Sequence, residues 1–375
     1  MLDEILFDVE EQEDDETLEV DKHKAKEVAD QRMTLFSNHS INVSRENRYR
    51  FPSSQFGYTV STTPTFVLHD FRQILNTYMR LEAYCDAVDD FSGPLPDYDF
   101  GKSEPDLFQA VFYPRSIAPR TPVRSLLPFF LSIRLIFQMK PLASIQMTEQ
   151  TLSSMWFRLV AHYFEWLAGI SELLFLNSAD KLRLTVCQLC KVICFSVVYA
   201  NYAMKNEEDQ DLLLFGSGYY WDPARGNDPL MDDYCQELKR VVDQVIVPVR
   251  KVRMTKEEFV IVKLIVLFDC TNLIGISQEG LMFSRSTCNK YREVLARYVR
   301  STFEEKAVAE GWNDETVVRL SIERINSLLD LPMGVEKLGQ VDDDILAALV
   351  ERNYGGMRGI LQQQIHTESK KIRNK

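Results

Sequence analysis

The sequence predicts an all-α protein with one short β-hairpin, and three observations support this fold class. Apolar residues recur at every third or fourth position over residues 152–167, which is the spacing of one broad helix face. Residues 180–204 are apolar on nearly every side, so this helix must be surrounded by protein or lipid. Residues 212–221 contain two short apolar runs around Gly216 and Gly218, which is typical of a hairpin because glycine accepts the backbone angles of a tight turn.

The apolar segment over residues 180–204 is predicted to be the buried middle layer of a helical domain. A membrane span needs about 20 clean apolar residues, and Arg183, Gln188 and Lys191 interrupt this segment. We therefore expect no membrane association.

Composition and charge exclude other classes of function. The 375 residues carry a net charge of −12, which gives no electrostatic attraction to nucleic acid, so direct binding of nucleic acid is not expected. The seven cysteines are scattered through apolar segments with no signal peptide before them. This pattern favours a reducing, intracellular compartment.

The N-terminal part of the chain is predicted to lie outside the folded domain. Residues 1–20 contain ten acidic residues and no Lys or Arg, so residues 1–62 are expected to form a disordered acidic tail and linker. A solvated tail is the simplest interpretation, and an activation-type peptide is the alternative. The domain is expected over residues 63–352, beginning with a helix at residues 66–87, a proline-rich loop at 94–122 and an apolar run at 126–137.

The C-terminal part of the domain reads as a series of helices. The pattern predicts helices over residues 232–247, 259–268, 277–303 and 314–331, the second of them after a capping box formed by Thr255 and Glu258. Pro332 should end the last of these helices. Asp342 to Asp344 are expected at the N-terminus of a short separate helix over residues 341–351, where negative charge is favourable. Residues 353–375 are expected to be a flexible basic tail.

Two stretches carry a resemblance to a known family. Residues 165–184 are similar to a signature in which an aromatic residue and a Lys end one helix, and a Phe, a Leu and an Asp-Gln pair lead into the next two. Residues 257–269 look like a motif of an acid, an aromatic residue, Leu-Lys and an apolar run. With the hairpin between them, they resemble helices 3 to 5 and helix 8 of the ligand-binding domain of nuclear hormone receptors, most closely the nematode branch. The resemblance covers roughly residues 66–352. It implies that the domain folds as a three-layer antiparallel helical sandwich. It also implies that the protein regulates transcription in the nucleus.

The resemblance does not extend to a DNA-binding domain. Nuclear receptors usually carry two zinc sites of four cysteines each upstream, and the first cysteine here is Cys85. We therefore expect the chain to lack the zinc-finger domain.

The resemblance also implies a pocket for a small apolar ligand between helices 3 and 5, the hairpin and the C-terminal helices. No other cofactor is expected. The alternative is that Trp156 and its neighbours simply fill the core, since protein interiors pack densely. The residues at matching positions are Leu152, Met155, Trp156, Leu159, Cys190, Ile193, Cys194, Val197 and Phe215.

A groove for a coregulator helix is implied at the end of helix 3, with the last helix beside it. Ala168 and Ala348 stand where the family carries a Lys and a Glu that cap the bound helix. Each such charge-assisted hydrogen bond is worth about 1.5 to 3 kcal/mol, so coregulator binding should be weakened. The matching residues are Phe164, Ala168, Lys181, Leu182, Thr185, Ile345, Leu346, Ala348 and Leu349.

A homo- or heterodimer partner is also implied, with a contact face over residues 314–331 and residues 269–303 beside it. The main alternative function is a degenerate receptor domain that binds no ligand and acts as a protein-interaction scaffold.

Catalytic and metal sites are not expected. Cys187, Cys190 and Cys194 share a helix face, but a zinc site needs four ligands and no partner pair is evident in the sequence. The three aspartates at 342–344 suggest a remote alternative, an all-helical prenyl-processing enzyme, but no second acidic motif stands opposite them.

Overall fold

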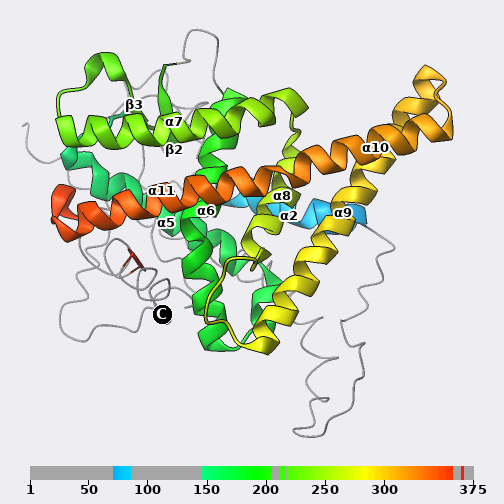
Figure 1. Ribbon diagram of the computed structural model, residues 1–375, viewed down its shortest axis with the longest axis horizontal. Helices are drawn as coiled ribbons and strands as arrows, with labels where there is room; N and C mark the ends of the chain where they lie inside the picture. The colour runs from blue at the N-terminus through cyan, green and yellow to red at the C-terminus, as the bar shows by residue number, and fades with distance from the viewer. Residues whose placement is uncertain (1–70, 87–144, 205–210, 217, 358–364, 367–375) are drawn as a thin grey trace, which may run out of the picture. The chain divides into compact units, whose positions relative to one another are not determined.

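The computed structural model of the protein describes residues 71–86, 145–204, 211–216, 218–357 and 365–366 (Figure 1). All of these belong to one compact unit, Thr62–Lys375. The predicted acidic tail and linker, the proline-rich loop, the apolar run at 126–137 and most of the predicted basic tail lie outside the described residues.

The described elements are mostly helices, with three short strands. The first are α2 (Phe71–Asp86), β1 (Ile145–Gln146), α5 (Glu149–Ala168), η3 (Ser171–Phe175), α6 (Ser178–Met204), β2 (Leu213–Gly216) and β3 (Tyr219–Trp221). They are followed by η5 (Pro223–Arg225), α7 (Pro229–Val252), α8 (Lys256–Phe268), α9 (Gln278–Glu310), α10 (Asp314–Leu329), α11 (Leu331–Glu351) and η6 (Tyr354–Gly356).

The helix α6 forms the middle of the domain, as the sequence predicts. It contacts α5, α7, α8, α11 and β2, and Figure 1 shows α7 and α11 running side by side across it. Leu184, Leu189 and Phe195 are completely buried. Its segment Ser178–Ala203 is long and apolar enough to cross a membrane, but 67% of its most apolar window is buried inside the protein. The surrounding helices therefore supply the apolar environment that this helix needs, and the all-α fold is confirmed.

The three strands form one small sheet in the order β1-β3-β2. Strands β2 and β3 make the predicted antiparallel hairpin, and Gly216 and Gly218 have φ angles of 125° and 86°, which only glycine adopts readily. Strand β1 adds a parallel neighbour to β3. Sequence analysis did not predict this strand because two residues are too short for a periodic signal.

Helix boundaries follow local capping chemistry. The capping box of α8 is present, with Thr255 N donating to Glu258 Oε2 at 2.8 Å. The predicted end of α7 near Pro248 is wrong, since the helix continues to Val252. Val249 is completely buried, and Arg253 closes the helix in the left-handed conformation, so packing and the cap outweigh the hydrogen bond lost at the proline.

The predicted short helix over residues 341–351 is also wrong. These residues form the second half of α11, a continuous helix of 21 residues. Pro332 lies in its first turn, where a missing amide hydrogen costs nothing, so the next helix begins at the proline and not at residue 341. Asp342 and Asp343 consequently lie in mid-helix and are buried, so charge complementarity at a helix N-terminus does not explain them.

The C-terminal end of the described chain packs against the domain. Met357, Ile365 and His366 are each only 1% exposed. The predicted flexible tail of residues 353–375 therefore contains positions that are part of the core.

Candidate functional site

A cavity of about 290 Å³ lies between α5, α6, β2 and α8. Four of the nine predicted pocket residues line it, and all four are apolar and buried. The structure thus brings part of the predicted pocket together around this cavity. These residues are Leu159, Ile193, Val197 and Phe215.

The wall of the cavity contains a buried ion pair. Lys263 Nζ lies 2.9 Å from Glu82 Oε1, and the two side chains are 3% and 4% exposed. The same ammonium group lies 4.3 Å from the centre of the Trp166 ring, where the negative ring face stabilises it. The pair joins α2 to α8 and leaves Lys263 with its charge already balanced.

Aromatic and small side chains shape the rest of the wall. Tyr199 stacks on Phe259 with ring centres 4.1 Å apart. Burial, followed by the nearby Tyr202, raises the pKa of Tyr199 to about 12, so its hydroxyl is neutral. Ser196 and Ala200 are small and keep the space beside α6 open. The cavity is therefore mostly apolar with a few hydroxyl groups along its wall.

The other five predicted pocket residues do not line this cavity. Trp156 lies against His366, with ring centres 5.3 Å apart and the planes nearly parallel. Gly355 of η6 approaches the start of α5 so closely that a Cβ there would lie 2.9 Å from Leu152 Cδ2. This part of the predicted pocket is occupied by the chain itself, as the alternative of a filled core predicts. The five residues are Leu152, Met155, Trp156, Cys190 and Cys194.

Beside Trp156 lies a buried cluster of polar groups. His366 Nδ1 is 2.8 Å from Asp343 Oδ1, and the Tyr234 hydroxyl donates to Asp342 Oδ1 at 3.1 Å. Burial raises the pKa of Asp342 to about 6, although hydrogen bonding to Cys194 and the charge of His366 both lower it. These groups connect α7, α11 and the end of the described chain.

Two thiols of α6, those of Cys190 and Cys194, face this cluster. Burial raises the pKa of Cys190 well above its ordinary value, and the charges of Asp343 and Asp342 raise it further. Burial and the charge of Asp342 do the same for Cys194. Thiols held protonated in this way are poor nucleophiles.

Sequence analysis did not assign Tyr234, Asp342, Asp343 or His366 to a site, and two of them show why. Asp342 falls on the buried stripe of α11 made by Val335, Leu338, Leu346 and Leu349, so helical periodicity could have identified it as a buried acid. His366 follows a polar stretch with no periodicity and gave no signal.

The predicted coregulator groove is only partly assembled. Lys181 and Leu182 are half-buried at the start of α6, and burial lowers the pKa of Lys181. Phe164 and Thr185 are fully buried, and Thr185 Oγ1 donates to the Lys181 carbonyl at 2.8 Å. Ala168 ends α5, and its side chain is outside what the structure describes.

The last predicted member of the groove, the helix containing Ala348, lies elsewhere. Leu346 and Leu349 are buried within α11, and η6 after it packs against Leu152 at the start of α5. Leu152 is about 18 Å along the helix from Phe164. The assignment of residues 345–350 as a separate helix beside the groove is therefore wrong. The four residues concerned are Ile345, Leu346, Ala348 and Leu349.

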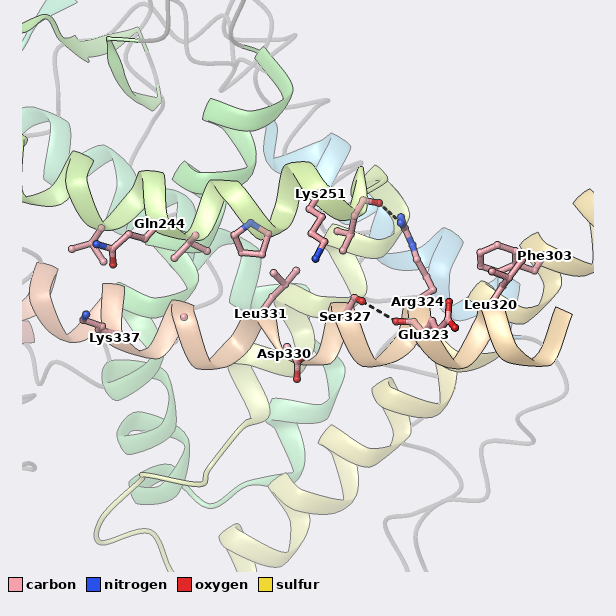
Figure 2. Close-up of a pocket in the computed structure, with 15 residues that line it drawn as sticks. Gln244, Lys251, Phe303, Leu320, Glu323, Arg324, Ser327, Asp330, Leu331 and Lys337 are labelled. Atoms are coloured by element: carbon pink, nitrogen blue, oxygen red, sulfur yellow. Dashed lines mark hydrogen bonds between the residues drawn. The ribbon is translucent and has the colours of Figure 1, made fainter. Parts of the chain in front are cut away.

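A second, more superficial groove of about 490 Å³ runs between α7 and the helices α10 and α11. Figure 2 shows Lys251 from α7 and Leu331 from α11 on its two sides, and the guanidinium of Arg324 directed at the end of α7. Arg324 also pairs with Glu258 at 2.7 Å. This groove adjoins residues 314–331, the predicted dimer face.

Comparison with known proteins identifies the family. The model of the ligand-binding domain of nuclear hormone receptors matches residues 138–331, just over half of the 375-residue chain. The chain is 24% identical over 222 residues to nuclear hormone receptor family member nhr-4 of Caenorhabditis elegans, a match that covers 56% of this chain and 44% of that protein. The chain thus spans less than half the length of this relative, and the likeness to a nematode receptor agrees with the predicted branch. Together with the helical fold around α6, the match shows that the chain belongs to the family of nuclear hormone receptor ligand-binding domains.

Proposed function

We propose that this protein is a regulator of transcription in the nucleus that binds a small apolar molecule in the cavity between α5, α6, β2 and α8. The observation that carries this proposal is the cavity itself, with about 290 Å³ of space beside apolar, buried side chains. Sites for small molecules usually measure about 300 to 1,000 Å³. The cavity lies at the lower end of this range, so the ligand is small for a molecule bound in such a site.

The charges around the cavity favour a neutral ligand. Lys263 is paired with Glu82 inside the wall, so a carboxylate would have to compete with an existing partner in a poorly solvated place. Lys256 lies at the rim but is exposed, and solvent screens its charge. An apolar molecule with one or two hydroxyl groups matches this lining best.

The proposal is tested by native mass spectrometry of the full chain, after which the same sample is denatured and its lipids are extracted. The expected result is a stoichiometric apolar molecule that is released only on denaturation. Ala200→Phe places a ring in the cavity and should abolish its recovery. Ala296→Phe, at a half-buried alanine of α9 that does not line the cavity, should leave recovery unchanged.

The second candidate function is a ligand-free interaction domain. It is favoured by the buried stacking of His366 on Trp156, which fills much of the predicted pocket with the chain itself. If the wild type and Ala200→Phe each show only the mass of their own chain with nothing bound, the result supports this candidate over the first.

We infer that partner proteins bind outside the cavity. Members of this family generally bind coregulators and dimer partners, and Ile322 and Met333 are 53% and 79% exposed on α10 and α11. If these residues form a homodimer contact, Ile322→Glu and Met333→Glu should shift sedimentation towards the monomer. Val308→Glu, at an 89% exposed position of α9, serves as the control.

A further inference from the structure

Three side chains that bind metals in other proteins converge beside Trp156, and they come from three separate parts of the chain. Cys190 belongs to α6 and Asp343 to α11. His366 lies 15 residues after Glu351, the last residue of α11. One ligand atom from each lies within 4.8 Å of the others. All three residues are buried.

Two polar atoms in the same cluster lack a hydrogen-bond partner among the residues that the structure describes. They are Asp342 Oδ2 and His366 Nε2, in residues that are each 1% exposed. Buried polar atoms are almost always satisfied because losing water without replacement is costly. The cluster thus offers an unused carboxylate oxygen and an unused ring nitrogen beside a thiol.

We propose that this cluster binds one zinc ion through Cys190, Asp343 and His366, with the Asp342 carboxylate as the fourth ligand. Thiolate, imidazole and carboxylate are the three ligand types that proteins offer to zinc, usually in a tetrahedron. Zinc bonds of about 2.0 to 2.3 Å place tetrahedral ligand atoms about 3.3 to 3.8 Å apart. The three atoms therefore need only small side-chain movements to reach that geometry.

Formation of the site requires two ligand atoms without a proton, the Cys190 sulfur and the His366 ring nitrogen that binds the ion. Cys190 is a neutral thiol without metal, and it releases its proton to solvent as the Cys190 Sγ to zinc bond forms. The resulting charges of zinc, one thiolate and two carboxylates nearly balance, which makes the ion easier to bury than the separate charges. The distribution of ligands means that the ion would fasten residue 366 to both α6 and α11. Zinc would therefore control whether His366 stays on Trp156.

The simpler interpretation is a buried hydrogen bond between Asp343 and His366. It accounts for their 2.8 Å contact but leaves Asp342 Oδ2 and His366 Nε2 unexplained. The two interpretations differ in a measurable way, because only the zinc site requires Cys190.

Titration of the metal-free, tag-free full chain with zinc in competition with a chromophoric chelator tests the proposal. The expected result is one zinc per chain, with at least about a 100-fold loss of affinity in His366→Ala and in Cys190→Ser, since even residues behind the ligands contribute about 10- to 100-fold. Cys288→Ser changes a buried thiol of α9 outside the cluster and should bind zinc as the wild type does.

Cobalt provides a second readout, and its wild-type spectrum does not depend on whether a variant folds. Cobalt bound to the wild-type chain should show the strong visible bands of tetrahedral coordination and a thiolate-to-cobalt charge-transfer band, and His366→Ala should weaken both. The proposal is overturned if the wild type binds no stoichiometric metal, if the cobalt spectrum lacks the thiolate band, or if His366→Ala and Cys190→Ser bind zinc as tightly as Cys288→Ser.

Discussion

Two adjoining faces of α6 carry similar small and apolar residues but are covered in different ways. On the side of Ile193, Val197 and Ala200 there is a cavity of about 290 Å³. On the side of Cys190 and Cys194, α11 and His366 fill the space. The identity of the residues on α6 therefore does not decide where the cavity lies, and the neighbouring elements do.

The neighbours differ in how closely they can approach α6. Helix α11 crosses at Gly339, where even a Cβ atom would lie 2.8 Å from the backbone nitrogen of Lys191. On the other side, the Glu82–Lys263 pair and the stacked rings of Tyr199 and Phe259 stand in the wall between α6 and α8. A glycine contact closes one side, and bulky side chains hold the other side open.

The largest effect is expected from breaking the ion pair in the cavity wall. Glu82→Ala leaves Lys263 buried and unpaired, and removal of one partner from a buried pair usually costs about 3 to 5 kcal/mol of the free energy of unfolding. Urea denaturation followed by circular dichroism measures this loss. The double variant Glu82→Leu with Lys263→Met should recover most of it, because no charge stays buried. A loss below about 1 kcal/mol in Glu82→Ala would mean that the pair does not hold this wall.

The next effect concerns the polar network that joins η3, which comes just before α6 in the chain, to α2 and α9. Glu172 in η3 accepts hydrogen bonds from Lys290 Nζ and from the hydroxyls of Tyr78 and Tyr291, each at 2.7 Å. Burial alone would raise the pKa of Glu172, but the charge of Lys290 and these hydrogen bonds lower it overall. Glu172→Gln should cost about 1.5 to 3 kcal/mol at neutral pH, the usual value of hydrogen bonds to a charged group.

The pH dependence of that loss has a definite sign. Because the pKa of Glu172 is lower in the folded protein than in the unfolded chain, its stabilisation is complete above the unfolded value of about 4.3 and disappears as the pH falls through the folded value. The difference in unfolding free energy between wild type and Glu172→Gln should therefore be constant near neutral pH and shrink below about pH 4. A difference that grows on acidification would contradict this account.

Much of the fold could be predicted from the sequence because local chemistry and periodicity agree there. The apolar surface of α6, the capping box at Thr255 and the glycines of the hairpin each have a local signature, and each is found in the structure. Pro332 was misread because a proline in the first turn of a helix looks the same in sequence as one that ends a helix. Only the packing of α11 on α6 and α7 decides between them.

The candidate site was less predictable because it depends on contacts between distant parts of the chain. Leu159 and Phe215 could be assigned by resemblance, and both line the cavity. The filling of the other part of the predicted pocket depends on His366, which lies more than 200 residues from Trp156 in sequence. No local pattern in the sequence encodes such a contact.

Alanine substitutions at two glycines of α11, Gly339 and Gly334, test how closely this helix approaches α6. Gly339→Ala forces a Cβ into the backbone of α6, and overpacking of this kind usually costs about 1 to 3 kcal/mol. At Gly334 the nearest atom to a new Cβ is Val245 Cγ2 at 3.5 Å, an ordinary contact. Gly334→Ala should therefore stabilise the helix by about 0.5 to 1 kcal/mol. Thermal unfolding of the two variants should shift in opposite directions, and equal shifts would show that Gly339 does not set the approach of α11.

The smallest effect is expected from adding a ring on the open side of α6. Ala200→Phe can place its ring in existing space, so the apolar surface that it buries offsets much of the lost side-chain freedom, and the net change should stay within about 1 kcal/mol. Cys194→Phe adds a ring to the side filled by Asp342 and His366, where no such space exists and overpacking should cost about 1 to 3 kcal/mol. Urea denaturation of both variants measures the contrast directly. If Ala200→Phe is as destabilising as Cys194→Phe, the cavity is not available to a ligand-sized group, and the filled-core function becomes the better account of the protein.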